Sequence, residues 1–216
     1  MNLIDKATPE LVLVSTSPYR RELMERLRLP FQVAAPRFEE NHQAYDDPRK
    51  MVLGLSRAKA MSVADDFSSA VLIGSDQIVW FDRKPVGKPL TRERALQQLQ
   101  SLRGKDHEFY TGLFLYDCRR RESQEYCIVG HGRLRADLSD DELRSYIELD
   151  DPLHSAGGVK TEGVGLMLFD KLECEDWTAI IGLPVMALAS GLRKWSYPLF
   201  PQTPKLICRN SLKWQK

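Results

Sequence analysis

The stretch LVLVSTSPYRREL, residues 11–23, predicts a β-strand that leads through a hydroxyl-rich turn directly into an α-helix. The run LVLV, residues 11–14, is typical of a short buried strand. Ser17 is a suitable helix N-cap, and Pro18 fits the first helical position. A plain turn favours Gly, Asn or Asp, and residues 15–20 contain none of them. The composition of this turn therefore raises the question of whether it binds an anion.

A strand followed by a polar turn and a helix start is a common phosphate-binding arrangement. Free backbone N–H groups and the positive end of the helix dipole face the same point there. Arg20 would add a planar guanidinium group whose geometry matches phosphate oxygens. The same residues also fit a helix in which Ser17 only caps the end and the arginines are solvated. This stretch alone leaves both interpretations open.

The length and composition predict an α/β protein with one domain. The chain has 216 residues, of which 43% are hydrophobic and 28% charged, as in ordinary globular proteins. Strand-like and helix-like segments alternate, which favours one large mixed sheet flanked by helices. We expect the domain to occupy residues 1–194. The tail, residues 195–216, is rich in proline and does not have the pattern of packed structure.

The charge and the termini exclude several classes of partner. A formal net charge of +1 provides no general attraction for nucleic acid. No apolar run approaches the ~20 residues that a membrane span requires. The N-terminus, MNLIDKATPE, lacks the apolar core of a signal peptide, so a cytoplasmic location is expected. The four cysteines show no CxxC pairing, so we expect reduced thiols rather than a zinc site.

The local patterns also predict individual elements. Expected strands include FQVAAP (31–36), two runs within VLIGSDQIVW (71–80) separated by an interruption, residues 107–117, residues 125–138 and LMLF (166–169). Expected helices begin at Asp47-Pro48 and run to about Asp66, at Thr91, at the capping box Ser139-Asp-Asp-Glu142, and near Pro184. The segments RKPVGKP (83–89) and 151–165 are expected to be a turn and a loop.

Lys59 lies on an unexpected face of the second predicted helix. At 100° per residue it falls between Leu55 and Val63, on the same side as Val52. An ammonium group in the middle of an apolar face either pairs with an anion or extends its head to the edge. Both outcomes are compatible with the sequence.

Several carboxylates and one further lysine complete the candidate site. Asp76 interrupts an apolar run next to Gly74, so it would be held on a rigid strand. Taken alone, Glu39 and Glu40 predict a solvated turn, and Lys88 predicts an exposed turn residue. Together with Asp76, however, a glutamate could hold a hard cation such as Mg²⁺ or Mn²⁺. The combination suggests metal-assisted attack on a phosphate ester or anhydride.

The motifs, taken in order, resemble one known family. They are STSPYRRELMERL (15–27), EE (39–40), RAKA (57–60), GSDQ (74–77), GKP (87–89), HEFYTG (107–112), HSAGGVKTEG (154–163) and GLP (182–184). Between about residue 11 and residue 193 the chain is similar to the Maf-like nucleotide pyrophosphatases. Within that family it most resembles the 7-methyl-GTP pyrophosphatase branch.

The resemblance implies a fold, a reaction and a set of site residues. The fold would be an elongated mixed sheet flanked by helices, with the active site in a cleft between two lobes. The reaction would be hydrolysis of a nucleoside triphosphate to the monophosphate and pyrophosphate with a divalent metal, Mg²⁺ or Mn²⁺. Relatives commonly form homodimers. The residues implied are Asp76 as general base and metal ligand, Glu40 as metal-linked glutamate, and Ser15, Arg20, Lys59 and Lys88 as phosphate-binding residues.

Three positions carry the expected preference for 7-methyl-GTP. Tyr19 would stack on the methylated base, whose positive charge an aromatic face attracts. Glu162 would accept hydrogen bonds from the N–H groups of the base and offset the positive charge of the base. Gln77 would donate and accept hydrogen bonds on the edge of the base. Tyr19 departs from the tryptophan of this branch. A broader or pyrimidine-preferring (dTTP or UTP) pyrophosphatase therefore stays an alternative, as does a nucleotide-sensing regulator of cell division.

Overall fold

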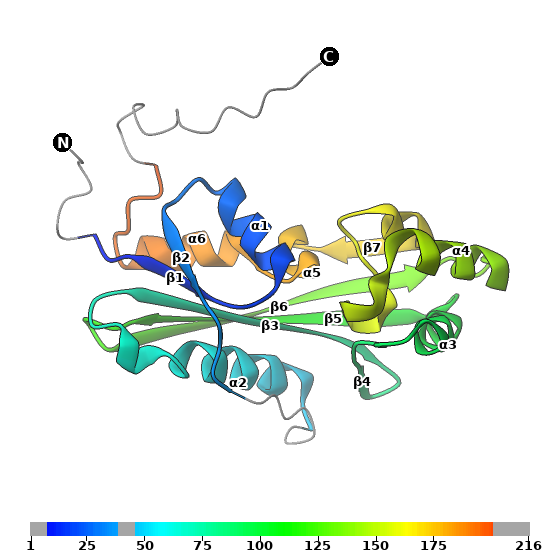
Figure 1. Cartoon of the computed structure of the whole chain (residues 1–216), viewed down its shortest axis with the longest axis horizontal. Helices are drawn as coiled ribbons and strands as arrows, with labels where there is room; N and C mark the ends of the chain where they lie inside the picture. Colours follow the sequence, from blue (N-terminus) through cyan, green and yellow to red (C-terminus); the bar gives the residue numbers. More distant parts are fainter. Residues whose placement is uncertain (1–7, 39–45, 201–216) are drawn as a thin grey trace, which may run out of the picture.

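A seven-stranded mixed sheet runs the length of the protein, with the order β2-β1-β3-β5-β6-β7 and β4 paired to β3 (Figure 1). The structure, a computed structural model, describes residues 8–38 and 46–200. The strands are β1 (Leu11–Val14), β2 (Phe31–Ala34), β3 (Val71–Phe81), β4 (Lys84–Val86), β5 (Asp106–Asp117), β6 (Glu122–Leu134) and β7 (Phe169–Cys174). The helices are α1 (Pro18–Arg26), α2 (Pro48–Met61), α3 (Arg92–Leu102), α4 (Asp140–Asp150), α5 (Trp177–Ile181) and α6 (Val185–Lys194).

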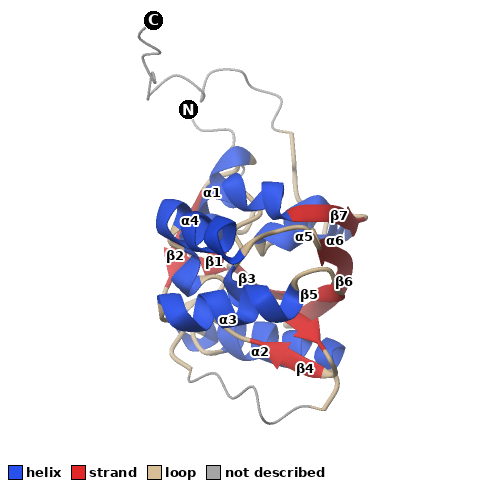
Figure 2. Cartoon of the chain, turned by 90° about the vertical axis from the view of Figure 1, so that its right-hand side faces the viewer, coloured by secondary structure: helices blue, strands red, loops and turns tan. Residues whose placement is uncertain are grey.

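Helices cover both faces of this sheet. β1 pairs in parallel with β2 and β3, whereas β3, β5, β6 and β7 are antiparallel. One face packs α1 and α6, where Met24 and Leu188 are fully buried. α2 covers the opposite face, while α3 and α4 pack together at one end (Figures 1 and 2). The predicted fold class, an elongated mixed sheet flanked by helices, is confirmed.

Two glycines allow α2 to lie unusually close to the sheet. Gly74 of β3 and Gly112 of β5 both face this helix. A Cβ atom on Gly74 would lie 2.1 Å from the carbonyl oxygen of Ser56, and one on Gly112 would lie 2.4 Å from that of Val52. Any larger side chain would push α2 away from the sheet, because backbone atoms cannot give way as a flexible side chain can.

The edge of β3 that faces β1 changes partner part-way along the strand. Its register with β1 ends at the pair Leu13↔Ile73, and its pairing with β4 begins at Val79. Between these points, no strand among the described residues pairs with this edge. The other edge stays paired with β5 throughout. A strand with one open edge in mid-course leaves room for a cavity beside a rigid backbone.

The structure confirms the predicted helix starts. Ser17, Asp47 and Thr91 each cap a helix through the side chain. Ser139 and Glu142 form the predicted capping box at α4. These predictions are right because capping depends on residues within one helical turn, which a sequence displays directly.

Five predicted elements or boundaries are wrong. β3 continues without interruption. The Ser75 hydroxyl group can donate to the Gly112 carbonyl, and Gly74 keeps its place in the pairing with β5. The turn at 83–89 contains the short strand β4, α2 ends at Met61 rather than about Asp66, and β6 ends at Leu134. The apolar run at 166–169 does not form a strand. It lies largely in a 3₁₀ turn in which Met167 is exposed, and β7 begins only at Phe169.

The chain still packs against the body after α6. Tyr197 is 8% exposed and belongs to the same core cluster as α1 and α6. Trp195 and Leu199 pack against this cluster as well. Packing therefore continues beyond residue 194, where the sequence predicted the tail to begin. Residues 201–216 of that tail lie outside the described residues.

We expect Gly112→Ala to destabilise the protein by about 1–3 kcal/mol, because its methyl group would overlap the α2 backbone. In a chain of this size, each kcal/mol lowers the melting temperature by roughly 2–4 °C. Thermal unfolding followed by circular dichroism measures the change. Gly87→Ala is the matched control, since its Cβ would meet nothing within 4 Å. Equal melting temperatures for both variants would contradict the close-packing interpretation.

Candidate active site

A cavity of about 850 Å³ opens beside β3 at the place where its edge is unpaired. One wall comes from the β1–α1 turn and the other from the turn after β4 and the loop at 151–162. β3 lines the cavity with Asp76, Gln77 and Ile78, and α5 lines it with Ile180 and Ile181. The cavity is thus lined by segments that lie far apart in the sequence.

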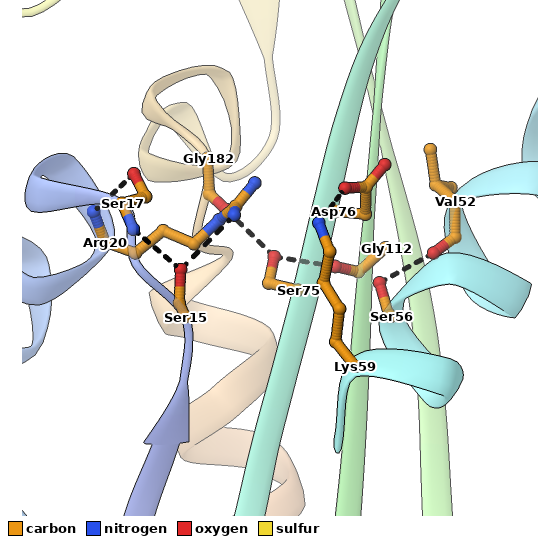
Figure 3. A network of polar contacts seen from close by, with 10 residues as sticks. All are labelled: Ser15, Ser17, Arg20, Val52, Ser56, Lys59, Ser75, Asp76, Gly112 and Gly182. Carbon is orange, nitrogen blue, oxygen red and sulfur yellow. Dashed lines mark hydrogen bonds and ion pairs between the residues drawn. The ribbon is translucent and has the colours of Figure 1, made fainter. Parts of the chain in front are cut away.

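Lys59 and Asp76 form a buried ion pair at the cavity (Figure 3). Each side chain is 6% exposed. Lys59 extends from α2 and Asp76 from β3, so the close contact of helix and sheet brings the two charges together. The unusual position of Lys59 on the apolar face is explained by this pairing, because an unpaired buried ammonium would be costly.

Asp76 retains one oxygen atom for other chemistry. Its Oδ1 accepts from Lys59, whereas Oδ2 is buried and has no hydrogen-bond partner among the described residues. A buried carboxylate oxygen without a partner is costly in a protein whose only role is structural. This oxygen is a hard donor that fits a divalent metal or a water molecule.

A metal would need further ligands. The described residues contain no group of three His, Cys, Asp or Glu that could hold one. Glu40, the second predicted ligand, and its neighbour Glu39 lie outside the described residues. A Mg²⁺ ion typically takes one or two carboxylates and completes its shell with water and substrate phosphates. The single free oxygen of Asp76 is compatible with that type of site.

The β1–α1 turn holds Arg20 in a fixed position. Ser15 Oγ accepts from the backbone N–H of Ser17 at 3.1 Å, and Ser17 Oγ accepts from that of Arg20 at 3.5 Å. The Arg20 Nε donates to the carbonyl oxygen of Gly182 at 2.8 Å, and its Nη1 lies 3.5 Å from Ser15 Oγ. Ser15 and Arg20 both line the cavity, as a phosphate-binding turn requires.

Gly182 is glycine for a conformational reason. Its φ of 126° is a backbone conformation that residues with a Cβ atom rarely adopt. This conformation ends α5 and turns the carbonyl group toward Arg20 and Ser75 (Figure 3). The glycine of the motif GLP at 182–184 therefore shapes the site through its backbone.

Gln77 points from β3 toward α5. Its Nε2 donates to the carbonyl oxygens of Ala179 at 2.7 Å and Ile180 at 2.6 Å. Both amide protons are then engaged, so a ligand in the cavity could use only the Oε1 atom. The predicted double role of Gln77, donating and accepting on a base, is therefore limited to accepting in this conformation.

The other predicted residues line the cavity at its sides. Tyr19 is half-buried, whereas Lys88 and Glu162 are exposed. Although Glu162 is exposed at the rim, partial withdrawal from water raises the pKa of its carboxyl above the usual value. Its own backbone N–H and Lys160 oppose this shift in pKa, and Asp150 and Glu22 add to it.

Comparison with known proteins assigns the chain to one family. The family model described as "Maf-like protein" matches residues 10–195. The chain belongs to the Maf-like protein family. It is 46% identical to a protein of Cupriavidus metallidurans over 89% of this chain and 96% of that relative. It is 44% identical to one of Ralstonia nicotianae over 89% of this chain and 98% of the relative. Both relatives are named 7-methyl-GTP pyrophosphatase.

Among solved structures, this Maf-like chain is similar to a HAM1 protein from Coxiella burnetii. The TM-score is 0.41 and the identity 16%, over 61% of this chain and 75% of that one. Neither fold nor function is inferred from a likeness this low. Within the described residues, no helix is long and apolar enough to cross a membrane.

Sequence reasoning missed several residues of the Maf-like cavity. Lys160, His154 and Leu90 all line it. The ammonium group of Lys160 donates to the carbonyl oxygen of Asp150, which fixes this loop to the end of α4. Leu90 donates its backbone N–H to the Leu153 carbonyl at 3.0 Å and so joins the two loops of one wall. Lys160 lies two residues from Glu162 within the motif HSAGGVKTEG, and this proximity is the signal that could have identified it as a cavity residue.

We expect Lys59→Met to destabilise the protein by up to about 3–5 kcal/mol, because Asp76 would keep a buried charge without its partner. Adding Asp76→Leu should recover most of this loss, since the remaining pair is apolar. Urea unfolding measures both free energies. The control Lys88→Met removes an exposed lysine of the same cavity and should change stability little. Equal losses in the single and double variants would argue against the ion pair as the cause.

Proposed function

We propose that this Maf-like protein is a nucleoside triphosphate pyrophosphatase that hydrolyses 7-methyl-GTP to 7-methyl-GMP and pyrophosphate. The observation that carries the proposal is the buried Asp76 at a cavity lined by cationic residues. It is paired with Lys59, and its second oxygen has no partner among the described residues. The names of the two relatives, which align over nearly their whole length, support the same reaction and the same substrate.

The cationic residues would bind the triphosphate. Arg20 is fixed by Gly182, and its guanidinium group presents several donors to phosphate oxygens. Ser15 adds a hydroxyl group, and Lys88 contributes a charge from the opposite wall. Lys59 lies at the buried end of the site, where it is paired with Asp76. Cations that are already in place can stabilise the negative charge that develops as the anhydride breaks.

Asp76 would act on the attacking water. Its Oδ2 can accept a proton as the water oxygen bonds to phosphorus and the P–O bond between the α- and β-phosphates breaks. A divalent cation, Mg²⁺ or Mn²⁺, would polarise the phosphate oxygens when bound. Asp76 and Glu40 would hold this cation. Lys59 would keep Asp76 in place through their ion pair.

The preference for a methylated guanine would come from the rim of the cavity. Methylation gives the base a positive charge, which the ring of Tyr19 would attract through its face. The carboxylate of Glu162 would offset this charge and accept from the base N–H groups. Gln77 would contribute its Oε1 alone, because its amide protons bind α5.

The test is pyrophosphate release by the purified protein with Mg²⁺ or Mn²⁺. The substrate panel is 7-methyl-GTP, GTP, dTTP, UTP and CTP. We expect the highest kcat/KM for 7-methyl-GTP, and a loss of at least about 10²-fold in kcat for Asp76→Asn, which removes the base. Lys50→Met, an exposed lysine outside the cavity, is the control. A preference for dTTP or UTP would refute the substrate, and an active Asp76→Asn variant would refute the role of Asp76.

The preference for 7-methyl-GTP over GTP should decrease as the pH falls. The pKa of Glu162 is raised, so this carboxylate becomes neutral at a higher pH than an ordinary glutamate would. Once neutral, it no longer offsets the charge of the methylated base. Ratios of kcat/KM for the two nucleotides across the acidic range measure the effect. Glu162→Gln should show a low ratio that does not vary with pH, and a constant ratio in the wild type would contradict the role of Glu162.

A further inference from the structure

The carboxyl end of α5 is held by four side chains from other elements. Helix ends carry carbonyl groups without partners inside the helix, and these groups must be satisfied elsewhere. The carbonyl oxygen of Gly182 accepts from Arg20 Nε and from Ser75 Oγ. That of Ala179 accepts from Gln77 Nε2 and from Thr111 Oγ1. Each carbonyl thus binds one residue of the candidate site and one buried hydroxyl group.

Ser75 shares its carbonyl with the arginine of the phosphate-binding turn. Its Oγ lies 2.8 Å from the Gly182 oxygen and 2.7 Å from the Gly112 oxygen, so its single proton can be donated to either of them (Figure 3). Arg20 reaches the same Gly182 oxygen at 2.8 Å from the other side. The side chain of Ser75 is fully buried and does not line the cavity. Ser75 therefore affects the site through Gly182 and Arg20 rather than by contact.

Thr111 occupies the equivalent place beside Gln77. These two residues are paired across β5 and β3, so their side chains lie on the same face of the sheet. Thr111 Oγ1 donates to the Ala179 carbonyl at 2.8 Å, the same oxygen that Gln77 binds. Thr111 is 1% exposed and does not line the cavity either. It holds the part of α5 from which Ile180 faces the cavity.

We propose that Ser75 and Thr111 are positioning residues with separate effects, Ser75 through Arg20 on phosphate binding and Thr111 through Gln77 and Ile180 on base selectivity. This inference rests on the proposed function. All nucleoside triphosphates share the phosphates, so a shift of Arg20 affects every substrate alike. The bases differ, so a shift of Gln77 or Ile180 changes the ratio between substrates.

Ser75→Ala tests the first effect. Loss of a hydrogen bond that orients a binding residue should raise KM by about threefold to tenfold for every nucleotide of the panel, with a smaller change in kcat. Ser56→Ala is the matched control. Ser56 is equally buried on α2, and its hydroxyl group donates to the Val52 carbonyl at 2.6 Å without a link to Arg20. An increase in KM no larger than that of Ser56→Ala overturns the proposal for Ser75.

A double-mutant cycle shows whether Ser75 acts through Arg20. In the Arg20→Ala background, adding Ser75→Ala should leave KM and kcat/KM unchanged, because the residue it positions is absent. If the two single effects on kcat/KM multiply instead, the proposed route through Arg20 is wrong. Binding of a non-hydrolysable α,β-methylene analogue of 7-methyl-GTP, measured by calorimetry, repeats the cycle without turnover.

Thr111→Val and Thr111→Ser test the second effect. Val keeps the shape and removes the hydroxyl group, so we expect the ratio of kcat/KM for 7-methyl-GTP over GTP to fall by about threefold to tenfold. Ser restores the hydroxyl group and should restore the ratio. An unchanged ratio in Thr111→Val, or an equal fall in Thr111→Ser, overturns the proposal for Thr111. This pair decides the inference if Ser75→Ala does not fold.

The outcomes separate this inference from the proposed function. A wild-type protein that neither binds the analogue nor releases pyrophosphate would refute the function itself. A wild-type enzyme with the expected preference, in which Ser75→Ala matches Ser56→Ala and Thr111→Val keeps its selectivity, would refute only the positioning roles.

Discussion

The close approach of α2 to β3 and β5 is the constraint on which the site depends. Gly74 and Gly112 remove the side chains that would hold the helix away from the sheet. At this short distance, Lys59 reaches Asp76 across the interface, and both charges stay buried because each neutralises the other. A helix packed at the usual distance on a sheet with larger residues would place its lysine farther from the carboxylate. Two residues without side chains therefore determine where the charged pair lies.

Successive side chains of β3 point to opposite faces of the sheet, which divides the site between these two faces. Asp76 points to α2, whereas its neighbours Ser75 and Gln77 point to α5. Both faces remain accessible from one cavity, because β3 loses β1 as a partner after Ile73 and gains β4 only at Val79. Asp76, proposed for catalysis, is consequently anchored to α2, and Gln77, proposed for base selectivity, to α5. One stiff strand fixes the geometry between them.

The sequence predicts the local and repetitive features of this molecule well. The α/β alternation, the caps at Ser17 and Thr91, and the inward position of Lys59 depend on residues a few places apart. The continuity of β3 and the strand β4 depend on pairing with distant segments, which local patterns do not contain. The direction of Gln77 likewise depends on carbonyls of α5, a hundred or so residues away in the chain. A sequence pattern predicts which polar residues gather, but the acceptors that orient them come from tertiary contact.

The first turn of α1 links phosphate binding to base selectivity. Tyr19 and Arg20 are consecutive in this turn, so they cannot move independently of the helix. Arg20 is tied to Gly182, and α5, which ends there, is tied to Gln77 through the Ala179 and Ile180 carbonyls. The aromatic face proposed for the base and the amide proposed for its edge are thus connected through the arginine proposed for the phosphates. Since Arg20 and Gln77 are both tied to α5 and its end, this short helix fixes the spacing between the arginine proposed for the phosphates and the amide proposed for the base.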